Sequence, residues 1–436
     1  MNTFESWGRF PKLQNQQVLP LPSPHNALPF PPEGRTVLPY GLGRSYGDSC
    51  INNGNAIIPT AGLSCFIDFD PQRGIVKAEA GVSLATILDV FVPRGWFLPV
   101  TPGTKFVTLG GAIANDIHGK NHHKAGTFGR HVLSFGLLRS DGAHHTCSPS
   151  ENGPLYCATI GGLGLTGLIT WVELQLTPIQ SPYLDTRTIK FRNLDEFFDI
   201  SVESDALFDY SVSWVDCTSE GDRLGRGLFM AGNFSSRSKR KKRPNLALPF
   251  PCEAPSWLLN SLFMRSFNNL YYNKQLSRTV DALTHYEPFF YPLDAILNWN
   301  RMYGKRGFFQ YQLVVPFEHD RNIIKEIFRR ITRSKRASFL AVLKTFGDIE
   351  SPGMMSFPTK GVTLALDFPN DGKPTLALMD ELDSIVKDAH GRIYAAKDAR
   401  MSPEMFRLSY PRVGEFAPFI DPNFSSSLWR RVMEPA

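Results

Sequence analysis

Hydrophobic side chains recur with two different periods in the first half of the chain. Residues 81–93 carry apolar side chains at helical spacing, with Ser83 placed to cap the helix and Pro93 to end it. The apolar stripe of this expected helix consists of Leu84, Ile87, Leu88 and Phe91. Residues 168–177 alternate between apolar and polar side chains, which predicts a half-buried strand closed by Pro178.

Beyond residue 181, glycines become few and longer periodic segments follow. Alternation predicts strands over 308–315, 339–343 and 362–368. Residues 322–333 predict an amphipathic helix, whose apolar face holds Ile323, Ile324, Ile327, Phe328 and Ile331. Strands that interleave with helices without regular β–α–β repetition favour an α+β fold.

The N-terminal segment over 17–40 contains seven prolines, so we expect an extended arm laid over the surface rather than a helix. A short strand is expected at 36–38, just before the first glycine turn. The chain has 436 residues, more than one hydrophobic core usually supports, and two domains are therefore expected.

Glycine is unevenly spread, since 22 of the 35 glycines lie between Gly34 and Gly167. Six of them fall within residues 100–131, together with four histidines and three lysines and with little apolar periodicity. Glycine lets backbone N–H groups approach a ligand closely, and successive N–H groups in turns form concave anion sites. We therefore expect residues 100–131 to bind a large anionic cofactor rather than to pack.

A second glycine segment, PYGLGRSYGD over 39–48, superficially resembles a dinucleotide-binding fingerprint. Its glycines fall at 41, 43 and 47, whereas that fingerprint needs two residues between the second and third glycines and a helix directly afterwards. The residues that follow, 48–54, read as a loop. The segment therefore predicts either a structural glycine turn or a phosphate site of another kind.

Composition and charge exclude several classes of protein. The net charge of +6 is accounted for by the run Arg237–Arg243, and without it 41 basic residues face 41 acidic ones, so broad nucleic-acid binding is not expected. The six cysteines show neither metal-finger nor disulfide spacing, which indicates a reducing compartment. No signal peptide and no transmembrane run are expected, so we predict a cytoplasmic protein.

Three segments together resemble the vanillyl-alcohol-oxidase (PCMH-type) family of FAD-binding flavoproteins. They are GLGRSYGD at 41–48, the stretch from AGVSLATIL at 80–88 to TLGGAIANDIHGK at 108–120, and ATIGGLGLTGLIT at 158–170. Further motifs are similar to the branch formed by the decaprenylphosphoryl-β-D-ribose 2-oxidases: WGR at 7–9, DIHGKNHH at 116–123, WNRMYG at 299–304, FQYQ at 309–312 and YAAKDAR at 394–400. The resemblance runs over nearly the whole chain.

The resemblance implies that residues 39–49 wrap the diphosphate of FAD, with Arg44 meeting its charge, and that other residues line the flavin and its ribityl chain. The residues it assigns to FAD are Pro39, Tyr40, Gly41, Leu42, Gly43, Arg44, Ser45, Tyr46, Gly47, Asp48, Ser49, Gly103, Thr108, Leu109, Gly110, Gly111, Asn115, Asp116, Ile117, His118, Ile169 and Tyr394. Some relatives attach the flavin covalently through a histidine, but those nearest to this sequence do not, and the expected FAD is non-covalent.

By the same resemblance, four residues belong to the catalytic group: Lys397, His118, Tyr46 and Lys120. The sugar pocket is assigned to Trp214, Phe290, Arg301, Gln310, Gln312, Lys344, Thr363, Ala365 and Asp367. Oxidation of an alcohol by a flavin needs a route for the hydroxyl proton and a cation near the reduced ring, which Lys397 would supply. Gln310 and Gln312 share one strand face by the two-residue period, which suits paired contacts to sugar hydroxyls.

Plainer interpretations of these residues stay open. Lys397 could be an exposed lysine paired with Asp398, and His118 could be a hydrogen-bonded core histidine. The glutamines could be buried amides satisfied by backbone. His122, His123 and His131 favour structural or solvent-facing positions, and no acid or cysteine nearby completes a metal site. The basic run could be a solvated loop or a contact with an anionic membrane.

The sugar pocket departs from the pattern of the actinobacterial relatives. Ala365 stands where they carry a cysteine, and Thr363, Phe290 and Asn115 replace an asparagine, a tyrosine and a cysteine. The flavin site is expected to survive these changes, whereas the polarity of the pocket changes. Inhibitors that act through that cysteine are therefore expected to form no adduct here.

Together these observations predict a two-domain α+β flavoprotein, with an FAD-binding domain over 1–181, a substrate domain on a largely antiparallel sheet over 182–391, and a C-terminal segment over 392–436 that completes the first. The resemblance implies oxidation of the C2 hydroxyl of a polyprenylphosphoryl ribose, completed by a short-chain NADH-dependent reductase. The alternatives are oxidation of a soluble sugar, alditol or aldonolactone, and a nonenzymatic membrane- or nucleic-acid-binding protein.

Overall fold

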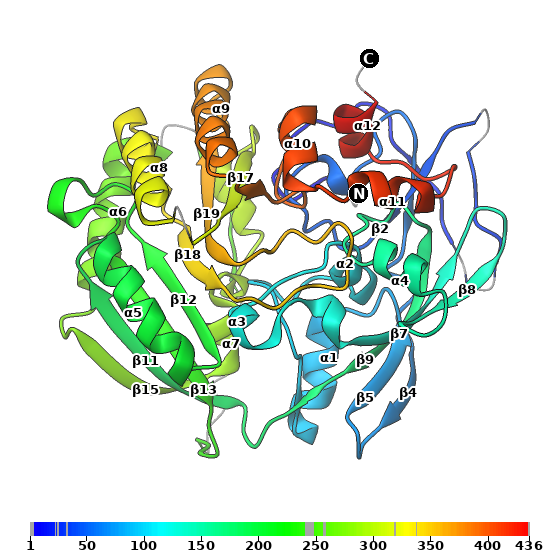
Figure 1. Ribbon diagram of the computed structural model, residues 1–436, viewed down its shortest axis with the longest axis horizontal. Coiled ribbons are helices and arrows are strands. Elements are labelled where there is room, and N and C mark those ends of the chain that lie inside the picture. The colour runs from blue at the N-terminus through cyan, green and yellow to red at the C-terminus, as the bar shows by residue number, and fades with distance from the viewer. Residues whose placement is uncertain are drawn as a thin grey trace.

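An eight-stranded antiparallel sheet forms the centre of the larger half of the protein, in a computed structural model that describes residues 4–21, 23, 26–31, 34–239, 248–255, 259–317, 320–336 and 338–434. Its strands, in spatial order, are β15 (Thr279–His285), β11 (Tyr183–Phe191), β13 (Gly227–Phe234), β12 (Tyr210–Val215), β18 (Ala341–Phe346), β19 (Gly361–Pro369), β17 (Phe308–Val315) and β20 (Arg392–Ile393). Figure 1 shows this sheet on the left of the molecule.

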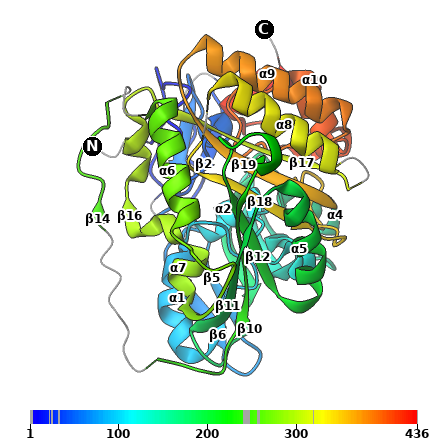
Figure 2. The ribbon, with the colours of Figure 1, turned by 90° about the vertical axis from the view of Figure 1, so that its left-hand side faces the viewer.

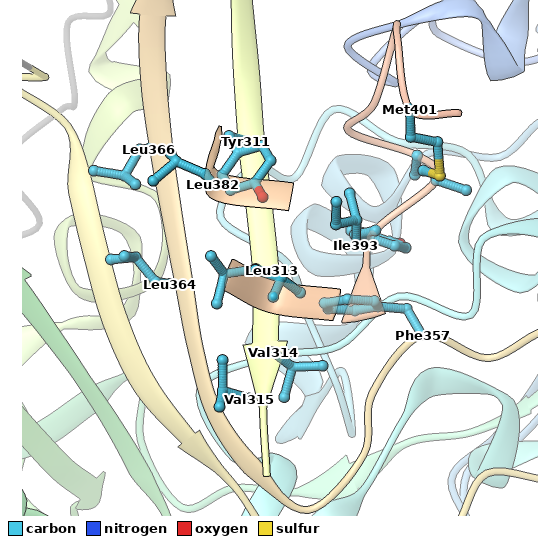
Figure 3. Close-up of a cluster of buried hydrophobic side chains, with 14 of the residues drawn as sticks. Tyr311, Leu313, Val314, Val315, Phe357, Leu364, Leu366, Leu382, Ile393 and Met401 are labelled. Atoms are coloured by element: carbon cyan, nitrogen blue, oxygen red, sulfur yellow. The ribbon is translucent and has the colours of Figure 1, made fainter. Parts of the chain in front are cut away.

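Three helices cover one face of this sheet: α5 (Leu194–Leu207), α8 (Asp320–Ser334) and α9 (Lys373–Asp388). Figure 3 shows side chains of β17 and β19 packed with Leu382 of α9 in the core beneath these helices. The helix expected at 322–333 is α8, and Ile324, Ile327, Phe328 and Ile331 of its predicted stripe are buried.

The smaller half is built on a five-stranded antiparallel sheet, on the right of Figure 1. Its strands, in order, are β4 (Phe66–Asp70), β5 (Ile75–Glu79), β9 (Leu168–Gln175), β7 (Val132–Leu138) and β8 (His144–Cys147). The helix α1 (Leu84–Phe91) confirms the expected helix: Ser83 accepts a hydrogen bond from the Thr86 N–H, and the four stripe residues are buried. The strand β9 confirms the alternation as far as Gln175, whereas residues 177 and 178 form a separate short strand, so Pro178 does not close β9.

Smaller elements connect the two sheets and complete the chain. A three-stranded parallel sheet consists of β1 (Gln17–Val18), β3 (Ala56–Pro59) and β2 (Val37–Tyr40). Two further sheets have two strands each: β6 (Trp96–Phe97) pairs with β10 (Thr177–Pro178), and β14 (Leu248–Pro249) pairs with β16 (Ile296–Leu297). The remaining α-helices are α2 (Leu109–Ala114), α3 (His122–Ala125), α4 (Gly153–Thr159), α6 (Ser261–Asn273), α7 (Tyr286–Phe290), α10 (Pro403–Ser409), α11 (Val413–Phe416) and α12 (Ser427–Met433).

The C-terminal helices return to the N-terminal half, as Figure 1 shows for α10, α11 and α12 beside β2. The Val37 N–H donates to the Asn423 carbonyl at 2.9 Å, and the Ser425 N–H donates to the Val37 carbonyl at 3.1 Å. Residues 392 and 393, however, pair with β17 and extend the eight-stranded sheet. The division of the chain at 181 and 391 stays a prediction.

The expectation that residues 100–131 do not pack was wrong for part of the segment. Thr108 caps α2 by accepting a hydrogen bond from the Gly111 N–H at 3.1 Å, and Leu109, Ala112 and Ile113 of this helix are buried. The signal was hidden because two glycines interrupt the apolar spacing. A single 3₁₀ turn over Asp48–Cys50 likewise replaces the loop expected at 48–54.

The strand β17 differs from the half-buried strand that its alternation suggests, because all eight of its residues are buried. Tyr311 and Leu313 face the core under the helices, while Gln310 and Gln312 face a cavity on the opposite side. Polar side chains on this strand therefore point to an interior site and not to solvent. The strand expected at 339–343 begins at Ala341 and continues to Phe346.

Candidate functional site

A cavity of about 760 Å³ runs between the other face of the eight-stranded sheet and the glycine-rich turns of the N-terminal half. The turns contribute residues 41–46 and 101–104, and the start of α2 contributes Thr108, Gly110 and Gly111. The two glycine segments meet here, since a Cβ atom added to Gly41 would lie 2.6 Å from the Thr108 hydroxyl oxygen. The fold therefore brings together two loops that lie about sixty residues apart in the sequence.

The first glycine turn presents unused main-chain donors to the cavity. Within the described chain, the backbone N–H groups of residues 41–45 make no hydrogen bond to another protein group. Gly43 adopts a positive φ of 60°, which glycine allows without strain. The Arg44 guanidinium stacks on Trp7 at 4.2 Å from the ring centroid and donates to the Leu42 carbonyl at 2.7 Å. Such a turn suits a diphosphate.

Three lysines face the cavity from the interior of the protein. The Lys344 ammonium donates to the Gly119 carbonyl at 3.0 Å, and the Lys120 ammonium donates to the Phe290 carbonyl at 3.2 Å. Burial lowers the pKa of Lys344 to about 7, with like-charge repulsion from Lys120 and Lys397 adding to the effect. Burial also lowers the pKa of Lys120 to about 8. The cavity therefore favours anionic ligands, which would raise both pKa values again.

Lys397 lies deeper, with its ammonium 3.9 Å from the centre of the Tyr46 ring. Burial lowers the pKa of Lys397, and the nearby Asp367 carboxylate opposes that shift. The plainer interpretation, an exposed lysine paired with Asp398, was wrong. Asp398 is buried and pairs instead with Arg431, at 2.9 Å between Oδ2 and Nη2.

His118 is joined to the sheet by a hydrogen bond to Gln312, at 2.8 Å between the two Nε2 atoms. The Gln312 amide donates this bond, which leaves the His118 proton on Nδ1. Burial, with Lys344 adding to the effect, holds the pKa of His118 well below its usual value. The ring is thus neutral, and its Nδ1 has no partner among the described protein groups.

The cavity brings together most of the predicted site residues. Those that line it are Pro39, Gly41, Leu42, Gly43, Arg44, Ser45, Tyr46, Ser49, Gly103, Thr108, Gly110, Gly111, Asn115, Ile117, His118, Lys120, Ile169, Trp214, Phe290, Gln310, Gln312, Lys344, Thr363, Ala365, Tyr394 and Lys397. The alternation of β17 accounts for Gln310 and Gln312, because their side chains point to the same face.

Seven predicted residues do not line the cavity: Tyr40, Gly47, Asp48, Leu109, Asp116, Arg301 and Asp367. The two acids of the glycine segments are turned away from it. Asp48 forms an ion pair with Arg431, and Asp116 accepts hydrogen bonds from the Gly129 N–H and the Ser356 hydroxyl. A carboxylate that faced a diphosphate would be repelled, so this placement is electrostatically sound.

The other residues outside the lining support it or lie apart from it. The Tyr40 hydroxyl donates to the Glu5 carbonyl, Gly47 packs against the Asp398 carbonyl, and Leu109 is a core residue of α2. Asp367 lies one layer behind the wall, where it accepts a hydrogen bond from Gln310 at 2.6 Å. Arg301 instead points toward Glu253 and the Phe250 carbonyl, away from the sugar pocket.

Several lining residues were not predicted. Thr101, Leu163 and Gly164 belong to the turns, and Gly164 lies in a motif that the sequence does display. Tyr271 and Lys274 come from α6 and its end, and nothing in the local pattern marks them as facing a cavity. Their place is set by the contact of α6 with the sheet, where Tyr271 lies 4.6 Å from Trp214 between ring centroids.

His122, His123 and His131 do not line the cavity. His122 is buried beside Phe346, and the ring Nε2 atoms of His123 and His131 contact the carbonyls of Phe208 and Ala125 at 2.9 Å and 3.0 Å. Within the residues that the structure describes, no group of three or more histidine, cysteine or acidic side chains is arranged to hold a metal ion.

The cavity fits a flavin dinucleotide on its own chemistry: free main-chain donors at one end, buried cations along the walls and an orphaned imidazole nitrogen beside them. Residues 31–148 match a family described as FAD binding domain. The protein is an FAD-dependent oxidoreductase with the α+β fold of the PCMH-type flavoproteins.

Comparison with known proteins narrows the class further. The chain is 38% identical over 418 residues to a decaprenylphosphoryl-β-D-ribose oxidase of Mycolicibacterium smegmatis. The alignment covers 92% of this chain and 89% of that protein. The chain belongs to the family of that enzyme. It is also 31% identical over 376 residues to an uncharacterized protein in the mprA 5′ region of Streptomyces coelicolor, covering 80% of this chain and all of that one.

A more distant match is confined to part of the chain. The Delta(24)-sterol reductase of Rattus norvegicus is 30% identical over 133 residues, which cover 30% of this chain and 26% of the reductase.

Proposed function

We propose that the protein oxidises the C2 hydroxyl of a polyprenylphosphoryl-β-D-ribose to the 2-keto sugar. The observation that carries this proposal is the meeting, in one cavity, of Lys397 and Tyr46 with the pair Gln310 and Gln312 and with further buried lysines. The likeness to an oxidase of decaprenylphosphoryl-β-D-ribose over 92% of the chain supports it.

FAD held by the glycine turns would supply the hydride acceptor for C2, and the hydroxyl proton would pass to a base of the protein. Lys397 would supply a cation beside the cofactor. Its lowered pKa keeps part of the population neutral near neutral pH, so the same amine is also able to accept a proton. Tyr46 covers the Lys397 ammonium and restricts its position.

The sugar would be held by the amides of Gln310 and Gln312. Each amide is fixed from behind, Gln310 by Asp367 and Gln312 by His118 and Thr363. Amides fixed in this way present their remaining polar atoms to hydroxyl groups with little loss of side-chain entropy. Lys120 and Lys344 donate to carbonyls and not to carboxylates, so their charges are available to the phosphate of the substrate.

Three further proposals concern cofactor, partner and location. FAD is bound without a covalent bond to His118. A short-chain NADH-dependent reductase then reduces the 2-keto sugar and completes an epimerisation.

The run Arg237–Arg243 contacts an anionic membrane; residues 240–243 of this run lie outside the described residues. Arg237 pairs with Asp185 at the surface, and the Lys239 ammonium donates to the Leu283 carbonyl at 3.1 Å.

The described helices include none that is both long and apolar enough to cross a bilayer. Neutralising the charges of the run Arg237–Arg243 should release the protein from anionic vesicles, and unchanged co-sedimentation would reject the proposed membrane contact.

The test of the reaction is anaerobic bleaching of the flavin absorbance in the purified holoenzyme. We expect farnesylphosphoryl ribose to bleach the flavin and to yield a product two hydrogens lighter by mass spectrometry. A free alditol and an aldonolactone serve as matched comparisons. Bleaching by these soluble substrates but not by the lipid-linked ribose would replace the proposal with oxidation of a soluble sugar.

A further inference from the structure

One row of side chains crosses the cavity face of the eight-stranded sheet and changes character along its length. Gln312 pairs with Ala365, Ala365 with Val342, and Val342 with Trp214, on four neighbouring strands. Paired residues of adjacent strands project to the same face, and all four line the cavity. The row therefore begins at the amide beside His118 and becomes apolar within one strand.

An aromatic path continues this row from the interior to the surface. Trp214 is only 5% exposed, and its ring lies 4.6 Å from that of Tyr271 on α6. Tyr271 stacks in turn on Phe267 at 6.0 Å between centroids, and Phe267 is 37% exposed. The Trp214 indole N–H donates to the Phe339 carbonyl at 3.0 Å, so the ring faces are left for apolar contact.

The walls around this path are also apolar. Val212, Met230 and Leu340 lie on the sheet side of the cavity, and Leu293, Ile296 and Leu297 lie on the other. Ile296 and Leu297 are more than a third exposed, which places them at the rim. Figure 2 shows β16, which carries them, near α6 in that view. The next turn of α6 beyond Phe267 adds Leu270, 72% exposed.

We propose that this path is a binding track for the isoprenoid chain of the substrate. The isoprenoid chain would pass from the sugar over Ala365 and Val342, then along Trp214 and Tyr271, and would leave the cavity across Phe267. This inference rests on the proposed function, because it takes the substrate to be a prenyl phosphate ester. Apolar surface is buried favourably in proportion to its area, so the chain selects the apolar part of the cavity while the sugar stays at the amides.

The volume of the cavity supports a track that is open to solvent at its outer end. A cavity of about 760 Å³ that also accommodates FAD takes only the first isoprene units of a long chain. The remainder has to lie outside, and the exposed apolar face of α6 begins where the track ends. Lys274, whose ammonium lies 3.4 Å from the centre of the Tyr271 ring, marks the polar border of this exit.

The track is tested by chain-length discrimination in the holoenzyme. The ratio of kcat/KM for farnesylphosphoryl ribose to that for methylphosphoryl ribose is measured in the wild type and in Tyr271→Ser and Phe267→Ser. We expect each substitution to lower this ratio about tenfold, the scale of losing a few apolar contacts in a pocket. Leu276→Ser is the control, because Leu276 is 93% exposed and lies outside the cavity lining.

A binding measurement separates the track from the reaction. Calorimetric titration of the holoenzyme with farnesyl phosphate and methyl phosphate should show tighter binding of the first, and weaker binding in Tyr271→Ser. An unchanged ratio and unchanged binding in both variants, with flavin content and circular dichroism intact, would overturn the track. Prenyl-dependent binding without turnover of either ribose ester would support the track and reject the proposed reaction.

Discussion

The two ends of the cavity are built from different parts of the polypeptide. At the cofactor end, the ligand would meet main-chain donors of turns in which side chains are excluded: a Cβ atom on Gly47 would lie 1.7 Å from the Asp398 carbonyl oxygen. At the substrate end, side chains on one face of a regular sheet form the wall. Substitutions at the first end disturb the backbone itself, whereas those at the second replace one contact at a time.

The difference bears on the four positions expected to depart from the actinobacterial pattern. Ala365 and Thr363 lie on β19 in the sheet wall, whereas Phe290 belongs to α7 and Asn115 follows α2 at the cofactor end. A sheet face tolerates such exchange because each side chain projects from a backbone that the ladder of hydrogen bonds fixes independently.

The largest effect on activity is expected from a substitution of Gly47, which should disrupt the cofactor end of the cavity. Gly47→Ala forces the Asp398 backbone away from the turn, and overpacking of this kind costs about 1–3 kcal/mol of stability. We expect the purified variant to lose its flavin and with it all activity. The ratio of flavin to protein absorbance measures this loss. Gly62→Ala is the control, since Gly62 has open space around its Cβ position, and a flavin-free Gly62→Ala would contradict the explanation.

A smaller but still large effect is expected at Lys397, where the two ends meet. Lys397→Met keeps the length of the side chain and removes the charge, so we expect FAD to be retained while kcat falls by a factor of about 10²–10³. Rapid-reaction measurement of flavin reduction checks this. Lys124→Met, on the exposed side of α3, should leave the rate unchanged. A loss of flavin with no change in the reduction rate per bound flavin would refute the assigned role.

The buried lysines of the substrate end predict how stability depends on pH. Burial lowers the folded-state pKa of Lys344 to about 7, against a usual value of 10.5. Between these values the unfolded chain binds more protons than the folded one, so the free energy of unfolding should rise with pH from about 7 upward. Lys344 contributes at most about 1.4 kcal/mol per pH unit to this slope, and the lowered pKa values of Lys120 and Lys397 add to it.

Urea unfolding of the flavin-free protein between neutral pH and pH values about two units higher measures this slope. Lys344→Met should lower the slope, because the variant has one fewer lysine that loses its proton on folding. A slope that is the same in the variant and the wild type would show that other groups cause it. Addition of methyl phosphate should weaken the dependence in the wild type by favouring the charged lysine.

The smallest effect on activity is expected from Ala365→Cys, which sharpens the contrast between the ends. Adding one sulfur to the sheet wall should change kcat/KM by less than about fivefold. The variant should nevertheless gain a covalent adduct with inhibitors that act through a cysteine at this position. Intact-protein mass spectrometry would detect the adduct, and an equal mass shift in the wild type would refute the assignment of position 365.

Cys50 is the internal comparison for this experiment. It also lines the cavity, but burial raises the pKa of its thiol to about 12. The thiolate is the reactive form, so Cys50 should stay unmodified under conditions that modify Ala365→Cys.

Local patterns predicted those elements that have a core on one side and solvent on the other. The apolar stripe of α1 and the alternation of β9 are examples. The strand β17 carries the same alternation, yet an interior cavity takes the place of solvent, and only its partners in the tertiary fold determine this. The helix α2 was missed because Gly110 and Gly111 lower its helical propensity.

At the site, the motifs located the residues but not the direction in which they point. Asp48 and Asp116 lie among cavity residues along the chain, and both turn to partners that are distant in sequence, Arg431 and Ser356. Tyr271 faces the cavity from a helix whose own pattern shows no such preference. Side-chain direction at these positions depends on contacts made across the fold, which no local spacing encodes.

Arg431 joins two segments of the cavity wall that are far apart in the sequence. Its guanidinium binds the carboxylates of Asp48, in the turn after the first glycine segment, and of Asp398, next to Lys397. The helix α12 thus ties the turn after the first glycine segment to the segment that carries Lys397. Local unfolding of this one helix is therefore expected to disturb both ends of the cavity at once.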